Sequence, residues 1–207
     1  MFPKPFKKLH SDILDKLESL EITSPNLVQS DSIPVIKSGS NLFCIAPEAS
    51  GKTTTLIITT LQKLKCEAEG NAPRAVVLVE NKEKALELYD QFIAYTKYNS
   101  LRVYVAYEKM HIDLQKSEIM EGVDILISTP KNMNKIFLLN GVNTAELKIF
   151  SVDDAEFLSQ QSDYAALLSI TQSIIKCQYV LYSEKLTPKL KRFENYFMEY
   201  SKTVSIK

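Results

Sequence analysis

Short apolar runs alternate with longer helix-like segments along most of this chain, and this alternation strongly limits the fold. The expected strands are 41–45, 75–79, 102–106, 123–127, 147–152, 178–182 and 203–206. The run 75–79 is wholly apolar, as is typical of a parallel strand covered on both faces. The intervening segments can supply the helical crossovers that parallel strands need. We therefore expect a three-layer α/β/α domain whose mostly parallel sheet has about seven strands.

The 207 residues fit one domain with a core of ordinary size. We expect a helical lead-in over 1–40 and an α/β core over 41–207, because no repeat, low-complexity tract or linker interrupts the pattern. Within the lead-in, a helix is predicted over 24–37, starting at a serine–proline pair that suits a cap and first turn. Another is predicted over 187–200, with its four aromatic residues on a buried face.

Composition excludes a strong global attraction to nucleic acid, since 25 basic residues balance 25 acidic ones. The three cysteines have no metal-ligand spacing and are typical of reduced thiols, so we expect a cytoplasmic protein. No run approaches membrane-spanning length, and the N-terminus lacks the apolar region of a secretory signal, so no membrane partner is expected. His10 and His111 are interpreted as structural or surface residues.

A small-residue loop follows the run 41–45 and precedes a helix-like segment over 54–65. Strand, loop and helix in this order wrap phosphate with backbone N–H groups, a lysine adds a point charge, and the next hydroxyl binds Mg²⁺. Ala46 stands where the general motif has its first glycine, and an ordinary helix start is the alternative. The residues expected to bind the phosphates are Ala49, Ser50, Gly51, Lys52, Thr53 and Thr54, with Thr53 also a Mg²⁺ ligand.

Two acids follow the expected strand 147–152, where a nucleotide site needs its second element. Asp153 is placed to hold Mg²⁺, and Asp154 to orient or deprotonate the attacking water, so Lys52 and Asp154 are the catalytic candidates. Paired acids at this place are also typical of a helix cap and first turn. The loop about 100 residues earlier favours the nucleotide interpretation.

Several segments in register resemble the N-terminal RecA-like domain of DEAD-box RNA helicases, over nearly the whole chain. The matching segments are Phe6 with 25–29 (the Q motif), 32–39 leading to Ala46, 77–79 with Lys82, Glu83 and Ala85 (motif Ia), 127–130 (motif Ib), 152–156 (motif II) and 182–183 (motif III).

The resemblance implies binding of ATP and Mg²⁺, with Phe6 and Gln29 contacting adenine. It also implies an RNA-binding row, weak for this domain alone, formed by Lys82, Thr129, Pro130 and Lys131. Solvated loop charges are the alternative for that row, and the charge-rich start of the helix near residues 80–84 is interpreted as a partly solvated face. Unwinding would need a C-terminal RecA-like domain, in cis or in trans.

Departures from the family pattern predict impaired hydrolysis. Glu48 brings a carboxylate near phosphate oxygens, which at ~5 Å and an effective dielectric of ~20 would cost at most about 3 kcal/mol. Ala49 replaces a glycine and its freedom to adopt positive φ. Asp154 replaces a glutamate and reaches about 1.5 Å less far, and a misplacement of that size can lower a rate on the order of 100-fold.

Motif III also differs, because a glutamate and a lysine follow Ser183. We expect Glu156 and Lys185 to form an ion pair that replaces the family's hydrogen bond to the last acid of motif II. Two functions stay open at this point. One is the ATP-binding half of an RNA helicase, and the other is a catalytically inactive module of the same fold that binds RNA or protein.

Overall fold

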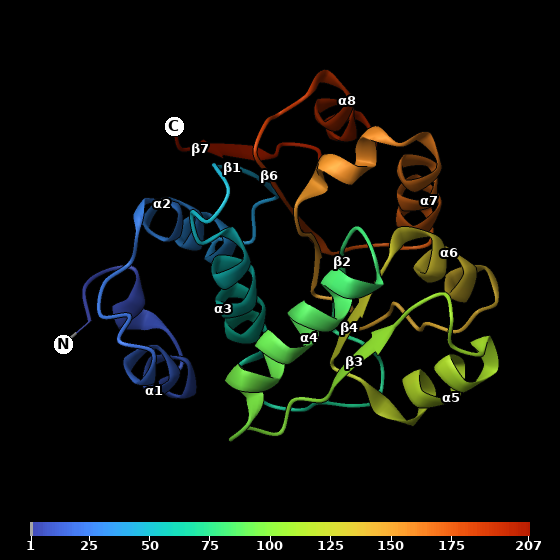
Figure 1. Cartoon of the computed structure of the whole chain (residues 1–207), viewed down its shortest axis with the longest axis horizontal. Coiled ribbons are helices and arrows are strands. Elements are labelled where there is room, and N and C mark those ends of the chain that lie inside the picture. The colour runs from blue at the N-terminus through green and yellow to red at the C-terminus, as the bar shows by residue number, and fades with distance from the viewer. Residues whose placement is uncertain (1) are drawn as a thin grey trace.

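The computed structural model describes residues 2–207, so Met1, the first residue of the expected lead-in, lies outside the described residues. Seven parallel strands form one sheet in the order β3-β4-β2-β5-β6-β1-β7 (Figure 1). They are β1 (Leu42–Ile45), β2 (Ala75–Leu78), β3 (Val103–Ala106), β4 (Ile125–Ser128), β5 (Ile149–Val152), β6 (Gln178–Ser183) and β7 (Lys202–Ser205). The predicted parallel sheet is confirmed.

Helices cover both faces of the sheet, as the three-layer prediction requires (Figure 1). They are α1 (Ser11–Ser19), α2 (Leu27–Lys37), α3 (Lys52–Leu64), α4 (Lys82–Thr96), α5 (Ile112–Gly122), α6 (Pro130–Leu138), α7 (Gln161–Gln172) and α8 (Pro188–Lys191). The first four contribute to one hydrophobic cluster and the last four to another. Within residues 2–207, no helix is both long and apolar enough to span a membrane.

Side chains of the central strands alternate between these two clusters. In β1, Leu42 and Cys44 belong to the first cluster, whereas Phe43 and Ile45 belong to the second. This follows from the two-residue period of a strand, and it explains why strands buried on both faces are continuous apolar runs. The sheet is therefore the middle layer of the domain.

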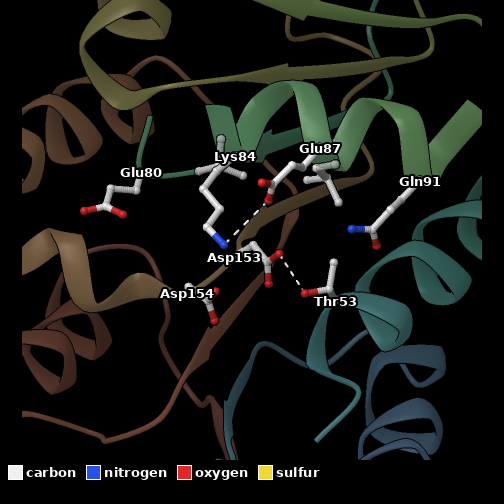
Figure 2. Close-up of a pocket in the computed structure, with 9 residues that line it drawn as sticks. Thr53, Glu80, Lys84, Glu87, Gln91, Asp153 and Asp154 are labelled. Atoms are coloured by element: carbon white, nitrogen blue, oxygen red, sulfur yellow. Dashed lines mark hydrogen bonds and ion pairs between the residues drawn. The ribbon is translucent and has the colours of Figure 1, made fainter. Parts of the chain in front are cut away.

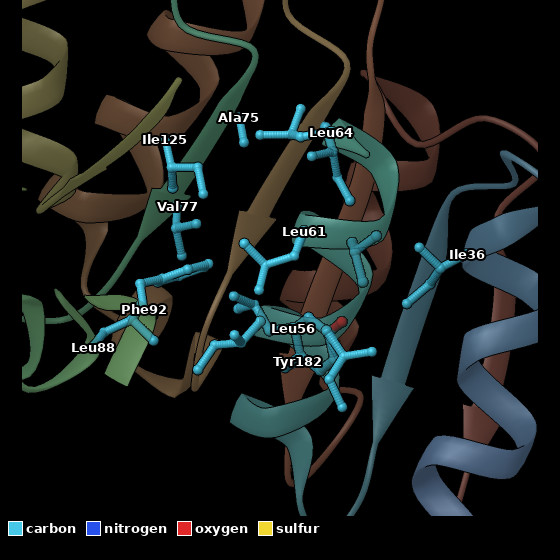
Figure 3. Packing of buried hydrophobic residues seen from close by; sticks show 14 of the residues in the cluster. Ile36, Leu56, Leu61, Leu64, Ala75, Val77, Leu88, Phe92, Ile125 and Tyr182 are labelled. Carbon is cyan, nitrogen blue, oxygen red and sulfur yellow. The ribbon is translucent and has the colours of Figure 1, made fainter. Parts of the chain in front are cut away.

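The first cluster joins the lead-in to the α/β core. Figure 3 shows Leu56 and Leu61 of α3 packed beside Val77 of β2 and Phe92 of α4. Fully buried residues of the lead-in, including Ile33, belong to the same cluster. Burial of this kind stabilises a fold by about 25 cal/mol per Å² of apolar surface, so the lead-in contributes directly to the core.

A buried ion cluster holds the amino ends of three strands together. Asp124 precedes β4, and its carboxylate accepts hydrogen bonds from Arg74 Nη2 at 2.6 Å and from Arg102 Nε at 2.8 Å. Arg74 and Asp124 are almost fully buried. Burial by itself would raise the pKa of Asp124, but hydrogen bonds from Arg102 and Arg74 outweigh it and hold that pKa below its usual value.

Helix α2 begins two residues later than the serine–proline pair indicated. Its cap is Asn26, whose side chain accepts a hydrogen bond from Gln29 N at 2.9 Å. In return, the Gln29 side chain accepts one from Asn26 N, also at 2.9 Å. This reciprocal capping box satisfies two backbone donors, which explains why the helix starts there.

The predicted helix over 187–200 is wrong. A short α8 is followed by a 3-10 turn, Arg192–Asn195, and the chain then leaves helical geometry. Phe193 is fully buried, but Tyr196 and Tyr200 are exposed, so the aromatic residues do not share one buried face. Tyr200 has a φ of +55°, which an α-helix does not allow.

Candidate functional site

The predicted nucleotide residues converge at the carboxyl edge of the sheet. Strand β6 pairs with both β1 and β5, so the segments that follow these three parallel strands emerge side by side. Ligand sites in open α/β sheets lie at this edge, where neighbouring connections diverge. The fold therefore explains why residues about 100 positions apart in the chain meet there.

Lys52, the first residue of α3, holds the loop that precedes the helix. Lys52 is buried, and its Nζ donates to the carbonyl oxygens of Ala46 at 2.9 Å and Pro47 at 2.8 Å. Ser50 Oγ donates to Pro47 O at 2.6 Å and tightens the same turn. These contacts place an ammonium group at the N-terminus of α3, where the helix dipole also favours an anion.

Gly51 is required by two features of this loop. Its φ is +89°, a region that favours glycine, and an added Cβ would lie 2.5 Å from Asn26 Nδ2. That close approach exists because Asn26 Nδ2 also donates to Ser50 O at 2.9 Å. The cap of α2 is thus bonded directly to the loop between β1 and α3, residues 46–51, which we call the phosphate loop. The sequence alone did not predict this contact.

Ala49 adopts positive φ although it is not glycine. Its φ is +54°, and its side chain and that of the neighbouring Glu48 are exposed. Alanine was expected to lose this conformation, whereas the structure retains it at a cost on the order of 1 kcal/mol. The glycine-like turn therefore survives with local strain.

Thr53 and Asp153 meet as predicted for the two sides of a magnesium site. Thr53, in the first turn of α3, donates its hydroxyl to Asp153 Oδ2 at 3.0 Å. Asp153 follows β5 and is 8% exposed, and its Oδ1 is buried without a hydrogen-bond partner. Since buried carboxylate oxygens are normally satisfied, this free oxygen beside a hydroxyl fits a hard divalent cation.

The raised pKa of Asp153 also fits a cation site. The pKa of Asp153 is raised to about 6, mainly by burial and secondly by the nearby charge of Asp154. The hydrogen bond from Thr53 and the charges of Lys52 and Lys84 act in the opposite direction. A bound cation would favour the ionised form, because opposite charge nearby lowers a carboxyl pKa.

Asp154 lies at the mouth of the site. Its φ is +48°, and it precedes the 3-10 turn Ala155–Ser159 without making a side-chain cap hydrogen bond. Its side chain is 53% exposed, and Oδ1 lies 3.9 Å from Lys52 Nζ. The carboxylate thus points toward the lysine of the phosphate loop and is open to solvent, as a group that orients water must be.

The two predicted adenine-binding residues are placed differently from each other. Gln29 is 3% exposed, and its Nε2 is 3.5 Å from the position of a Cβ on Gly51, so it lies beside the phosphate loop. Phe6 is fully buried in the first cluster, with its ring centroid 6.2 Å from that of Phe2. In this arrangement Phe6 presents no ring face to a base, so the expectation that it contacts adenine directly is not supported.

The proposed ion pair between Glu156 and Lys185 is wrong. Glu156 Oε1 instead accepts hydrogen bonds from Ser183 Oγ at 2.6 Å and Glu184 N at 2.5 Å. No Glu156–Lys185 pair lies within ion-pair distance in the described structure. The hydroxyl of Ser183 is nearer than the lysine and needs no long side chain to be ordered, so the serine bonds the last acid directly.

The predicted nucleic-acid row is engaged by side chains of the chain itself. Lys82 Nζ lies 4.7 Å from the ring centre of Tyr107, and the Thr129 hydroxyl donates to Glu108. The third polar member pairs with another acid.

Lys131 Nζ lies 3.6 Å from Asp163 Oδ1, and Pro130 is buried in the first turn of α6. Tyr107 and Glu108, which follow β3, carry no sequence signal that would have assigned them to this row. Their contacts with Lys82 and Thr129 emerge only in three dimensions.

Two cavities adjoin the phosphate loop. One, of about 350 Å³, is lined by Glu48, Ala49, Gly51, Lys52, Thr53, Thr54, Lys84 and Asp154. A smaller one, of about 80 Å³, shares three of these residues and is also lined by Asp153. Lys84 was missed by sequence reasoning, which treated its segment as a solvated face. Residues two apart on a helix point in different directions, and that geometry separates Lys84 from Lys82.

His10 is less isolated than its sequence neighbourhood indicated. Its Nδ1, a carboxylate oxygen of Asp12 and the Sγ of Cys66 lie within 4.8 Å of one another. Asp12 N donates to His10 Nδ1 at 3.4 Å, which makes the imidazole the cap of α1. Capping accounts for the position of the histidine without a bound ion.

Known proteins share this sequence pattern and this fold. The chain is 29% identical over 195 residues to ATP-dependent rRNA helicase RRP3 of Candida albicans, covering 92% of this chain and 36% of that protein. It is 26% identical over 208 residues to pre-mRNA-processing ATP-dependent RNA helicase PRP5 of Vanderwaltozyma polyspora, covering 96% and 24%. The chain therefore spans about a quarter to a third of these relatives.

Solved structures give the same architecture. A DEAD box protein from the hyperthermophile Methanococcus jannaschii superposes with a TM-score of 0.88 at 19% identity, covering 97% of this chain and 55% of that one. Saccharomyces cerevisiae dbp5 superposes with a TM-score of 0.83 at 16% identity, covering 96% and 52%. These likenesses establish a RecA-like fold. The sequence profile of the family described as DEAD/DEAH box helicase matches residues 26–191, more than half of the chain, and the chain therefore belongs to that family.

Proposed function

We propose that this chain binds ATP with Mg²⁺ and serves as the N-terminal, ATP-binding half of an RNA helicase. The carrying observation is the contact between Thr53 and Asp153, which leaves a buried carboxylate oxygen free beside the phosphate loop. Family membership and the names of the relatives support ATP and RNA as ligands. The curated relatives are much longer, so a second RecA-like domain is proposed to complete the helicase.

The roles of the individual side chains follow from their positions. Backbone N–H groups at the start of α3 and the ammonium of Lys52 bind phosphate oxygens, for which Lys52 exchanges its bonds to the loop carbonyls. Thr53 and Asp153 hold the cation, which when bound neutralises charge on the phosphates. Asp154 orients the attacking water from its exposed position. Gln29, beside the loop, remains the candidate for adenine.

Hydrolysis is proposed to be slow. Asp154 is a short side chain that must reach water beyond the terminal phosphate, and its Oδ1 lies 3.9 Å from Lys52 Nζ. Ala49 holds a strained turn, and the adjacent exposed Glu48 adds negative charge to the same cavity. Together these features favour binding over turnover, because small errors in position are costly in the transition state.

RNA binding by this domain is proposed to be weak. Phosphate would have to displace Glu108 from Thr129 and Asp163 from Lys131 before it could use those groups. Displacing a negative partner offsets much of the attraction that a basic side chain offers to the backbone. The second candidate function, a RecA-like module without turnover that contacts RNA or protein, is favoured instead by the positive φ of Ala49 and the carboxylate of Glu48 beside the loop.

A binding titration tests the proposal. A fluorescent ATP analogue is titrated with Mg²⁺ and with EDTA into the wild-type chain, Lys52→Ala and Asp153→Asn. We expect binding by the wild type, loss in Lys52→Ala, and loss of the Mg²⁺ dependence in Asp153→Asn. The matched control is Lys97→Ala at the exposed end of α4. Absence of binding by the wild type, or binding indifferent to Lys52, would contradict it and leave the non-catalytic module.

A further inference from the structure

The first turn of α4 sends its two lysines to different places. Lys82 Nζ lies over the ring of Tyr107 at 4.7 Å, away from the nucleotide cavities. Lys84 lines both cavities beside the phosphate loop. Figure 2 shows its side chain pointing from α4 into the space above Asp153. The positions follow from the 100° turn per residue of an α-helix.

Charge in these cavities is unbalanced toward the negative. Their lining contains five carboxylates, Glu48, Glu80, Glu87, Asp153 and Asp154, but two lysines, Lys52 and Lys84. Lys52 is already bonded to two loop carbonyls. A polyphosphate entering this space adds several negative charges. A second ammonium group there would therefore interact strongly and favourably with the ligand.

The restraint on Lys84 is weak. Its Nζ pairs with Glu87 at 3.6 Å, and both side chains are more than half exposed. Pairs three residues apart on an exposed helix contribute little to stability. The ammonium can therefore leave Glu87 for a more highly charged anion without a substantial loss of stability.

We propose that Lys84 is a second phosphate-binding lysine, supplied by α4 from outside the phosphate loop, which contacts the terminal phosphate of a bound nucleoside triphosphate. The inference rests on the proposed nucleotide function. It assigns the terminal phosphate because Thr53, Asp153 and Asp154 line the same cavity as Lys84, whereas the candidate adenine residue Gln29 lies on α2. Lys84 thereby discriminates a triphosphate from a diphosphate.

The discriminating measurement is the ratio of ATP to ADP affinity, with Mg²⁺ present. Lys84→Met is expected to bind ATP about tenfold more weakly than the wild type, as for loss of one charge-assisted contact, and to bind ADP within about twofold. Lys84→Arg should restore most of the ATP affinity, because it keeps the charge. Lys97→Met, on the exposed end of the same helix, should change neither.

A second variant moves affinity in the opposite direction. Glu87→Gln frees Lys84 from its partner and should strengthen ATP binding about twofold. Thermal melting of each variant checks that the fold is intact. Equal losses of ATP and ADP in Lys84→Met, or unchanged ATP binding with the wild type active in the assay, would overturn the role of Lys84 alone. No ATP binding by the wild type would overturn the proposed nucleotide function as well.

Discussion

Replacing Asp153 with asparagine should make the nucleotide-free protein more stable while removing a ligand of the proposed magnesium site. Asp153 is 8% exposed, and one carboxylate oxygen is buried without a partner. Burial raises its pKa to about 6 from an ordinary value of 3.8. The folded protein at neutral pH therefore carries an ionised group that it holds less favourably than the unfolded chain does.

The size of this effect follows from the two pKa values. A difference of this size corresponds to about 3 kcal/mol of lost stability at pH 7.5, where the carboxyl group is ionised in both states. Asparagine avoids that cost but leaves an amide N–H group unpaired, which takes back about 1 kcal/mol or more. We expect Asp153→Asn to gain about 1–2 kcal/mol at pH 7.5 in EDTA.

The pH dependence carries the sharper test. Because the folded pKa is raised, the folded state binds a proton more readily than the unfolded state between about pH 6 and pH 4. The contribution of Asp153 to wild-type stability should rise as the pH falls through that window, and the advantage of Asp153→Asn should shrink or reverse by pH 4. This comparison between variants cancels the titration of the other carboxyl groups.

Urea unfolding at pH 7.5 and pH 4, monitored by circular dichroism, measures the difference. Adding Mg²⁺ to a nucleotide should stabilise the wild type beyond the effect of the nucleotide alone and add nothing to Asp153→Asn, since only the wild type keeps the carboxylate. Asp113→Asn, which changes an exposed carboxylate on α5, is the matched control. A variant less stable than the wild type at pH 7.5, or an advantage that is the same at both pH values, would refute the reasoning.

Three further predictions concern the loop, the ion cluster and the nucleic-acid row. Ala49→Gly should relieve the positive φ and raise the melting temperature by about 2 °C; a lower melting temperature would show that no strain is stored there. Asp124→Asn should lower the unfolding free energy by about 3 kcal/mol in urea titrations, because Arg74 stays buried and keeps only the exposed Glu69 as its counter-charge; a loss below about 1 kcal/mol would contradict this. Glu108→Gln should free Thr129 and tighten binding of a single-stranded RNA about threefold at low salt in anisotropy measurements, with less gain at high salt; unchanged affinity would place Thr129 outside the RNA path.

The sheet was predictable because its five central strands are buried on both faces. A strand in that environment must be apolar at successive positions, as 75–79 is, and that signal is local. The meeting of Thr53 and Asp153 was predictable for a related reason, since parallel strands deliver their following residues to one edge.

Features set by competition between partners were not predictable in this way. Glu156 could bond either a lysine or a serine, and the choice of Ser183 depends on distances that no local pattern records. The segment after α8 has helical spacing of its aromatic residues, yet the exposed Tyr196 and Tyr200 show that tertiary packing overrides the pattern.

The strained turn at Ala49 and the acidic cavity beside it together link ligand binding to the stability of the domain. The positive φ of Ala49 and the unpartnered Oδ1 of Asp153 both cost stability in the free protein, and a cation at Asp153 would remove the second cost. Cation binding is therefore coupled to relief of unfavourable charge at the junction of α3 and β5. In the proposed complex the same ligand would contact Lys52 and Lys84, which come from different helices. A nucleotide with its cation would then connect α3, α4 and the end of β5, so that binding alone, without rapid hydrolysis, would change the state of the domain.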